Sequence, residues 1–495
     1  MIRSCQTVVL GVITLASLTA CRVGPNYHAP VLPTGTEAPL VSLNTVAETP
    51  TPPPDAWWRL YEDPQLDSLV QQALQANYTL AAADANFAAA RAVLSAVHAE
   101  RYPSTAAVAG GLYGRDATTD EILELTGRPP QTFWLYEDIF QAAYEVDLFG
   151  RVHRAIEAAN ANADAVAAVR DSVRVVVAAE TARAYTAICA LGDELSVANH
   201  SLAVVSHEAD ITVKRHEAGA NSNYDVARAQ ALVAQVRSTI PELQGQRRVA
   251  LFELTALLGR TPAQAPNDLS NCVTPPRLAA LIPVGDGSEL IKRRPDVRQA
   301  ERRLAAATAE IGVATADLYP TIRLVGLYGG VAVQLSQLNT NEGRTWGVGP
   351  SISWSFPNMA APRARVRQAK AAQAAALASF DGVVLTALKE IEQALAAYGA
   401  ALDNRQALGD AQDKVHTAFG IAQDQFLAGA LSNLDLLTTE QSLVAIDAAV
   451  ASSDAALAQD QIAIFKALGG GWRSASQPIR LGETHDSTLP AANHQ

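Results

Sequence analysis

The hydrophobic pattern predicts a long amphipathic helix that leads directly into a β-strand. Pro295 suits the first turn of a helix, where its missing N–H group costs nothing. Apolar side chains then recur at three- and four-residue steps, the period of a helix with one buried face: Val297, Ala300, Leu304, Ala307 and Ile311. The helix should end at Tyr319-Pro320, because a proline pushes the preceding residue out of helical geometry. Apolar residues from Ile322 onwards predict a strand.

The same helix-to-strand transition occurs once earlier, which indicates an internal duplication. Residues 66–99 are predicted to form one helix, Tyr102-Pro103 ends it, and a strand of small residues follows. A shift of 210 residues superimposes two turns and the ends of the helices after them without a gap: Ala218-Gly219-Ala220 on Ala428-Gly429-Ala430, and Leu258-Gly259 on Leu468-Gly469. The period is far longer than that of the common solenoids, so the chain is one duplicated half and not a repeat array.

Two segments alternate between apolar and polar residues, which is typical of strands with one apolar face. The apolar positions are Phe140, Ala142, Tyr144, Val146 and Leu148 in the first, and Trp346, Val348, Pro350, Ile352, Trp354 and Phe356 in the second. Each segment has about ten residues, enough to cross a bilayer when tilted. A half-buried strand of a soluble sandwich is the alternative, but aromatic residues on the apolar faces favour a membrane. Residues 115–131, before the first segment, are expected to form a long polar loop.

The chain offers four strands, two within residues 104–149 and two within residues 321–356. Four strands cannot close a membrane barrel, since the smallest known have eight. An open sheet edge in lipid is excluded, because each unsatisfied backbone group costs several kcal/mol there. The strands must therefore come from more than one copy. Two copies give eight strands, three give twelve and four give sixteen, and the pattern does not choose among them.

The remaining segments predict helices far longer than the ~11–12-residue average of globular domains. Residues 151–191 contain no Gly or Pro, and such a helix would span about 60 Å. A second helix should reach about Glu217, and after the turn 218–223 another runs to Leu258, with a kink expected at Pro241. In the second repeat we expect helices over residues 363–398, 403–428 and 431–468.

The N-terminus carries an export signal. Arg3 precedes a mostly apolar segment, Val8 to Leu18, which is too short to span a bilayer comfortably as a helix. The segment ends in Leu18-Thr19-Ala20-Cys21, which resembles the cleavage signal of bacterial lipoproteins. That resemblance implies a lipid on Cys21, and Arg22 in place of an aspartate implies sorting to the outer membrane.

These features divide the chain into six parts. They are the signal peptide, 1–20; a lipid-anchored Pro-rich linker, 21–62; the first repeat, 63–260; a connector, 261–288; the second repeat, 289–472; and a polar tail expected to be disordered, 473–495. Trp57-Trp58, near the end of the linker, is expected to pack it against the body.

Charge and composition exclude several functions. Removing residues 1–20 takes away one basic residue and no acidic one, so the net charge of −12 becomes −13, which argues against nucleic acid as a partner. No catalytic motif, phosphate-binding loop or cofactor motif is present, so we expect no enzyme and no cofactor. His200 and His207 lie two helical turns apart, where a solvated face is favoured over a metal site. Cys189 and Cys272 could pair in an oxidising compartment, although two isolated cysteines are more often unpaired.

In combination, several motifs resemble TolC-type outer membrane efflux lipoproteins, the OprM and NodT group. They are the lipoprotein signal, WWRLYEDPQLDSLVQQAL, RRPDVRQAERRLAAATAEIGVATADLYP, and the paired turns AGANSNYDV and AGALSNLDL. The resemblance extends from Met1 to about Trp472. It implies a mostly α-helical protein with membrane β-strands: a homotrimer with a twelve-stranded β-barrel in the outer membrane, continued by a long α-helical barrel in the periplasm.

The function implied is a passive exit duct for small molecules in a tripartite efflux system. Its partners would be outer membrane lipid, a periplasmic adaptor protein and an inner-membrane pump, usually of the resistance-nodulation-division class. The alternatives are a general diffusion porin or a duct like those of type I secretion. A periplasmic enzyme or scaffold would leave the alternating strands unexplained. The long helices argue against a porin, which does not need them.

Two sets of candidate site residues follow from this reading. The two turns are expected to lie together at the periplasmic tip and to contact the adaptor through Gly219, Asn223, Gly429 and Asn433. The resemblance also implies a periplasmic gate just after the second turn, with Leu434 at its apolar position. The family's usual Asp and Arg correspond here to Thr438 and Gln441, and the alternative is that Asp435 and Glu440 do the same work.

Overall fold

The structure is a computed structural model that describes most of the chain. The described residues are 22–36, 38, 40–42, 48–49, 53–115, 117–127, 129–266, 268–278, 282–284 and 291–470. Cys21, the signal peptide and the predicted polar tail lie outside them. The chain forms two compact units. We call them the sheet unit (Met1–Leu32, Ala85–Ala168 and Asp296–Val383) and the hairpin unit (Pro33–Asp84, Val169–Pro295 and Val384–Gln495).

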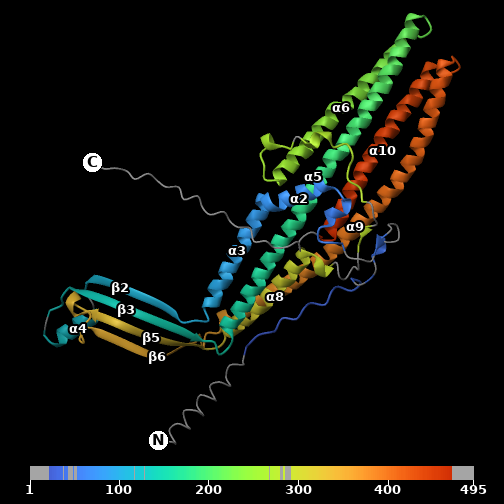
Figure 1. The fold of residues 1–495 in the computed structure, drawn as a ribbon. Coiled ribbons are helices and arrows are strands. Elements are labelled where there is room, and N and C mark those ends of the chain that lie inside the picture. Colours follow the sequence, from blue (N-terminus) through green and yellow to red (C-terminus); the bar gives the residue numbers. More distant parts are fainter. Residues whose placement is uncertain are drawn as a thin grey trace, which may run out of the picture. The chain divides into compact units, whose positions relative to one another are not determined.

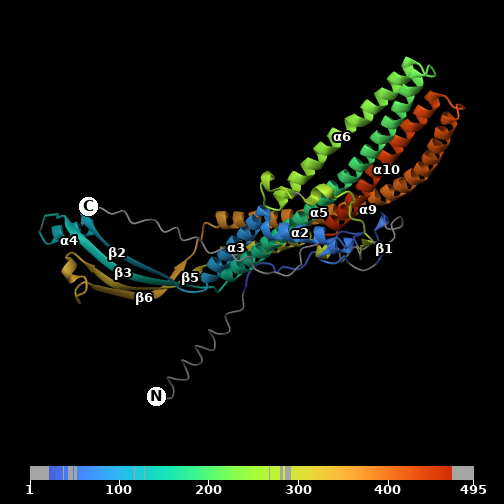
Figure 2. The same cartoon turned by 45° about the horizontal axis from the view of Figure 1, so that its top comes forward.

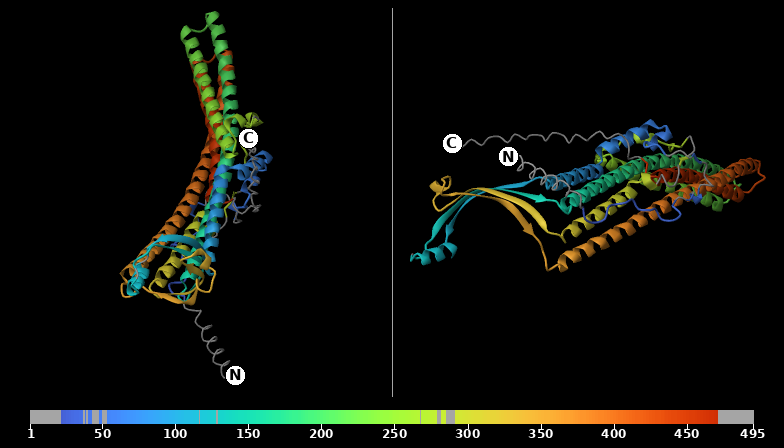
Figure 3. Two further views of the ribbon diagram at one scale, coloured as in Figure 1. Left: turned by 90° about the vertical axis from the view of Figure 1, so that its left-hand side faces the viewer. Right: turned by 90° about the horizontal axis from the view of Figure 1, so that it is seen from below.

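The sheet unit is built around one antiparallel sheet of four strands in the order β2-β3-β5-β6 (Figure 1). The strands are β2 (Ser104–Gly114), β3 (Phe133–Val146), β5 (Thr321–Ala332) and β6 (Arg344–Ser353). They curve together, as Figure 3 shows from below. The first pair comes from the first repeat and the second pair from the second repeat, and β3 pairs with β5 to join them.

The strand register confirms the predicted apolar faces. Phe140 on β3 lies opposite Tyr328 on β5, and Tyr328 lies opposite Trp346 on β6. Because directly paired residues of an antiparallel sheet project to the same side, the alternating apolar positions of β3 and β6 share one face. The segment expected to be a polar loop between β2 and β3 is instead partly helical, as α4 (Ala117–Leu125). Its Asp120 is buried and forms an ion pair with Arg115.

Helices also contribute to the sheet unit beside the strands. The amphipathic helix predicted after Pro295 is present as α8 (Pro295–Ala316), and Val297, Leu304 and Ile311 are buried as expected. In the core, Ala161 contacts Ala305 and Ala306, since small side chains let the helix backbones approach closely.

Two helices are longer than predicted, and both run through both units. The first is α5 (Arg151–Glu217), which does not break near residue 191, and the second is α9 (Ala360–Leu427), which is continuous across residues 398–403. The prediction was wrong for α5 because Gly192 does not end the helix. A Cβ atom there would collide with the carbonyl oxygen of Cys272, so this glycine permits close packing.

The segment predicted as one helix over residues 66–99 is two. These are α2 (Pro64–Ala76) and α3 (Tyr78–Ala99), separated at Asn77. The Asn77 side chain accepts hydrogen bonds from the backbone N–H groups of Thr79 and Leu80, which caps the new helix. An apolar pattern alone does not reveal such a cap within a continuous hydrophobic run.

The hairpin unit contains two long helical hairpins (Figure 2). One is formed by the end of α5 with α6 (Asn223–Leu257), and the other by the end of α9 with α10 (Asn433–Ala467). Pro241 lies inside α6, which continues through it. Short elements complete the unit: β1 (Glu48–Thr49) paired in parallel with β4 (Ile282–Pro283), and the 3-10 helices η2 (Trp57–Tyr61), η3 (Pro262–Gln264) and η4 (Asp268–Asn271).

Aromatic packing and a disulfide fasten the hairpin unit. Trp57 is completely buried and stacks on Phe465, with ring centroids 4.8 Å apart, which confirms the predicted packing of the linker's end. Cys189 and Cys272, left open by the sequence, form a disulfide with their Cα atoms 4.7 Å apart. The bond joins α5 to the connector. Arg247 supports it by donating hydrogen bonds to backbone carbonyls on both sides, including those of Ile188 and Cys272.

Candidate functional site

The two hairpin turns lie at the same end of the hairpin unit in two views (Figures 1 and 2). Gly219 and Gly429 both have a φ of +76°, a left-handed conformation that is costly for residues with a Cβ atom. Each turn closes in the same way: Ala220 N–H donates to the Arg215 carbonyl and Ala430 N–H to the Gln425 carbonyl, both at 2.8 Å. These bonds satisfy carbonyls at the helix ends.

Serine caps begin the second helix of each hairpin. The Ser222 hydroxyl accepts a hydrogen bond from Asp225 N–H, and the Asp225 carboxylate accepts one from Ser222 N–H in return. Ser432 and Asp435 form the first of these bonds, and the Ser432 hydroxyl donates to the Asp435 carboxylate. Asp435, a candidate gate residue, therefore caps its own helix. Asn223 and Asn433, the candidate contact residues, are the first residues of α6 and α10.

Two side chains of the first hairpin reach the second one near the turns. Thr212 donates from Oγ1 to the Asn433 side-chain oxygen at 3.2 Å. Arg215 donates to the Phe426 carbonyl at 3.0 Å, and its guanidinium lies 4.3 Å from the centre of the Phe426 ring. Phe426 itself is buried. A hydrogen bond to a charged donor and a cation–π contact both stabilise such an interface, so Arg215 is its strongest polar link.

Among the described residues, the remaining gate candidates form no hydrogen bond or ion pair with the other hairpin. Leu434 is 48% exposed. Thr438 donates from its hydroxyl to the Asp435 carbonyl within α10, and Gln441 is exposed. All three are therefore available to residues outside this chain.

The hairpins also bury two carboxyl groups that the sequence reading did not single out as a pair. Glu208 on α5 and Glu440 on α10 are 4% and 2% exposed. Gln423 on α9 donates to Glu208 Oε1 at 2.7 Å. Burial, and then the nearby Glu208 carboxylate, raise the pKa of Glu440 to about 7. A signal was present: Glu440 interrupts the buried apolar series Leu436, Leu437 and Leu443 at helical spacing.

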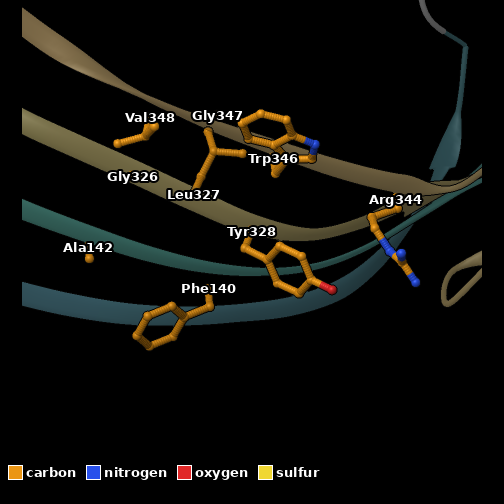
Figure 4. Close-up of a pocket in the computed structure, with 9 residues that line it drawn as sticks. All are labelled: Phe140, Ala142, Gly326, Leu327, Tyr328, Arg344, Trp346, Gly347 and Val348. Carbon is orange, nitrogen blue, oxygen red and sulfur yellow. The ribbon is translucent and has the colours of Figure 1, made fainter. Parts of the chain in front are cut away.

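In the sheet unit, aromatic side chains lie at two levels along the strands, and Figure 4 shows the level that Phe140, Tyr328 and Trp346 form on the apolar face. Phe140, Tyr328 and Trp346 line a shallow hollow of about 620 Å³ towards the end of the strands that carries α4. At the other end, Trp354 stacks on Phe356 and Phe149 stacks on Tyr319, with ring centroids 4.8 and 4.5 Å apart. Eight residues separate Trp346 from Trp354, or about 26 Å of strand. A strand tilted by about 40° would rise about 20 Å over that length, so the two levels lie near the two edges of an apolar band of about 25 Å, as the aromatic girdles of membrane barrels do.

The opposite face of the sheet is polar near the end of the strands that lies away from α4, which we call the base of the sheet. Glu145 on β3 accepts hydrogen bonds from Arg151 at 2.7 Å and from Arg323 on β5 at 3.4 Å. Serines and glycines of β6 occupy this face beside them. The sheet therefore has one face suited to lipid and one suited to water.

The residues that follow Cys21 are held against the sheet unit. Arg154, which is almost fully buried, donates hydrogen bonds to the carbonyls of Val23 and Gly24 and to the Asn26 side chain. Arg22 packs against Gly150, the last residue before α5. The segment directly after Cys21 is thus fixed at the base of the sheet.

No chemistry of another kind is evident in the described part of the chain. His200 and His207 are exposed on α5. No group of three or more potential metal ligands occurs among the described residues.

Comparison with known proteins gives consistent matches over nearly the whole chain. A family model described as outer membrane efflux protein matches residues 69–260 and 287–470. Nodulation protein T of Rhizobium leguminosarum bv. viciae is 29% identical over 96% of this chain and 95% of its own length. The pyoverdine export outer membrane protein OpmQ of Pseudomonas aeruginosa is 30% identical over 86% of this chain and 89% of its own. The solved outer-membrane channel OprN is 33% identical, with a TM-score of 0.85, covering 91% of this chain and all of that one.

Proposed function

The chain belongs to the outer membrane efflux protein family, and we propose that three copies of it form one duct through the outer membrane and across the periplasm. It is an outer membrane channel of an efflux or export system, in a family of channels and not of enzymes. We further propose how the channel is assembled, anchored and connected to its partners.

The observation that carries the proposal is the unclosed sheet with one apolar face. The strand order leaves β2 and β6 at the two edges of the sheet. In lipid, both edges need partners, because unpaired backbone groups are too costly there. Three copies give a closed barrel of twelve strands, the number that the TolC-type resemblance implies. Such a barrel can hold a channel, whereas an eight-stranded barrel fills with side chains.

Exposed apolar helices support the same assembly. The most apolar stretches of α3 and α9 are long and apolar enough to span a membrane. Only 11% and 17% of the residues in these stretches are buried within one chain. In a trimer these faces would pack against neighbouring copies, in the α-helical barrel that continues the strands. Apolar surfaces of this size on a lone chain would promote aggregation.

The N-terminal segment supports a lipid anchor. The strands and the segment from Arg22 to Asn26 belong to the same compact unit, and Arg154 holds that segment. A lipid on Cys21 would therefore enter the membrane beside the base of the barrel. Mass spectrometry of the mature N-terminus tests this, and an unmodified Cys21 or cleavage elsewhere would contradict it.

The hairpin turns are where we propose that a periplasmic adaptor binds. The adaptor would connect the duct to an inner-membrane pump, which supplies the energy and delivers small molecules. The pump is proposed to be of the resistance-nodulation-division class. The turns support this role because they present exposed small residues, Gly219 and Gly429, at the end of rigid helical hairpins.

Native mass spectrometry of the detergent-solubilised protein, combined with planar-bilayer conductance, tests the duct. We expect a trimer that conducts weakly alone and supports efflux when the cognate adaptor and pump are present. A stable monomer or tetramer would contradict the assembly. A large conductance without the adaptor would favour a general diffusion porin, and export of a protein substrate would favour a type I-like secretion duct.

A further inference from the structure

The two helical hairpins bury a pair of carboxyl groups with a single hydrogen-bond donor between them. Gln423 donates to Glu208 Oε1. Glu208 Oε2 and Glu440 Oε1 are buried without a hydrogen-bond partner in the described part of the chain. Three helices supply the cluster: α5, α9 and α10. It therefore spans the contact between the two hairpins.

Burying such groups in the ionised form is unfavourable. A carboxylate moved from water into a protein interior is costly unless a cation or several hydrogen bonds compensate it. No ion pair joins Glu208 or Glu440 to a basic side chain among the described residues. Two carboxylates near each other also repel, so one of them favours a bound proton.

The other charged groups on these helices are engaged elsewhere or face the solvent. On these helices they include Arg215 on α5, against Phe426; His416 on α9, bonded to Asp447 on α10; His216 on α5, bonded to the Asn221 carbonyl; and the exposed His207 and Lys214 on α5. On the neighbouring α6, Arg228 lies over the Tyr224 ring and Arg237 is exposed. The experiment below separates the effect of His416 from that of the two carboxyl groups.

We propose that Glu208 and Glu440 form a proton-binding site between the two hairpins, so that one shared proton holds the hairpins together and its loss loosens them. The effect on conductance rests on the proposed duct function, whereas the effect on stability does not. The site lies beside the apolar cluster of Phe426 and Leu436, close to the turns. Loosening there would favour the open duct.

The direction of the pH dependence follows from the pKa of Glu440, which rises from an ordinary 4.5 to about 7 in the packed hairpins. Below 4.5 the group is protonated whether the hairpins are packed or apart. Between these values only the packed form keeps its proton. The free-energy preference for the packed form therefore shrinks as the pH rises and is lost through pH 7. From pH 6 to pH 8 the equilibrium should shift about tenfold towards separation, and then level off.

Glu440→Gln tests the site, because glutamine imitates the protonated carboxyl group in size and cannot ionise. The unfolding temperature of the detergent-solubilised full-length protein is measured at pH 6, 7 and 8. Because glutamine is neutral in both forms, we expect the variant to melt at a higher temperature than the wild type, with a difference that grows from pH 6 to pH 8. In planar bilayers the wild-type conductance should rise from pH 6 to pH 8, and that of the variant should not.

Two further variants control the result. Glu208→Gln removes the neighbouring charge, so the transition should move to lower pH. His416→Gln should keep the wild-type pH response. A wild type that is insensitive to pH, an unchanged response in Glu440→Gln, or a response that disappears in His416→Gln would each overturn the proposal.

The two readouts also separate this inference from the duct itself. A protein that conducts, but whose wild type and Glu440→Gln variant melt alike at every pH, overturns the proton site and leaves the duct. A protein with the expected pH-dependent difference in melting, but without conductance, overturns the duct and leaves the proton site.

Discussion

The two hairpin turns have the same backbone and different surroundings. Both turns have a glycine at a φ of +76°, followed three residues later by a serine cap. The shift of 210 residues, however, places Gln425 where the first hairpin has Arg215, and Ala418 where it has Glu208. Near the turns, the first hairpin thus supplies the Arg215 side chain that reaches across, and the second supplies the Phe426 surface that receives it.

The difference shows which parts of a duplicated element are constrained by its own geometry. A left-handed turn needs glycine, and an exposed helix start needs a cap, wherever the hairpin is used. Side chains on the contact face depend on the partner instead. Two hairpins that pack against each other can therefore diverge there while the turns stay alike.

Gly219→Val and Gly429→Val should produce the largest effect and should do so equally. A residue with a Cβ atom in left-handed geometry costs about 1–2 kcal/mol, more for a β-branched one, so each turn should rearrange. Nothing lies within 4 Å of either added Cβ, so the helices need not be disturbed. We expect efflux to be abolished with the trimer retained in the outer membrane.

Gly245→Ala is the matched control, because this α6 glycine also has open space around it but has no positive φ. It should leave efflux unchanged. Normal pumping by either turn variant would contradict the assignment of the turns to the adaptor contact. Loss in one variant alone would show that the two turns are not equivalent.

Arg215→Ala should have the next largest effect, with Gln425→Ala, its equivalent in the second repeat, as control. The first change removes the bond to the Phe426 carbonyl and the contact with its ring, worth about 1–3 kcal/mol together. The second removes an exposed side chain. Thermal unfolding should therefore show a loss only in Arg215→Ala, and its closed-state conductance should rise. Equal effects of both would contradict the one-sided contact.

A smaller effect is expected at the gate candidates. Leu434→Ala should raise the closed-state conductance, because this exposed apolar side chain is proposed to meet its copies in the trimer. Tyr224→Ala, at the equivalent position of the first hairpin, should not, and Thr438→Ala should have a smaller effect than Leu434→Ala.

The same gate should respond weakly to salt. Neutral contacts are insensitive to ionic strength, whereas exposed ion pairs weaken as screening increases. The wild-type closed-state conductance, corrected for bulk conductivity, should therefore change little. A channel that opens steeply with salt, or a silent Leu434→Ala, would place an ionic gate elsewhere.

Much of the fold could be predicted because its signals are local. Strand faces follow from alternation, α8 from its apolar period, and the two turns from glycines in a repeated motif. The continuity of α5 could not be predicted, because it depends on tertiary contacts. The Cys272 carbonyl packs closely against Gly192, and the helix continues through this glycine. The disulfide likewise requires two distant segments to meet, which spacing does not encode.

The candidate site divides in the same way. The turn glycines and the asparagines that follow are predicted from sequence, whereas Arg215 and Glu208 carry no local signature within the long helix α5. Asp435 is a gate candidate by resemblance, and the structure shows that it also caps its helix. A family resemblance identifies corresponding positions, whereas the contacts in the structure determine what the side chain at each position does.

The smallest expected difference lies in the caps. Asp225 accepts from both the backbone N–H and the hydroxyl of Ser222, and these bonds lower its pKa below the usual range, whereas Asp435 accepts only from the Ser432 hydroxyl. Asp225→Asn should therefore destabilise the start of α6 more than Asp435→Asn destabilises that of α10, by about 1 kcal/mol at most.

A carboxylate with a lowered pKa stabilises the folded form above its ordinary pKa, and this contribution is lost as the pH falls. The Asp225→Asn effect, measured by hydrogen exchange of the first-turn amides with correction for intrinsic rates, should shrink between pH 6 and pH 3. An effect that is constant with pH, or equal in the two hairpins, would show that the reciprocal bond in the first cap contributes nothing.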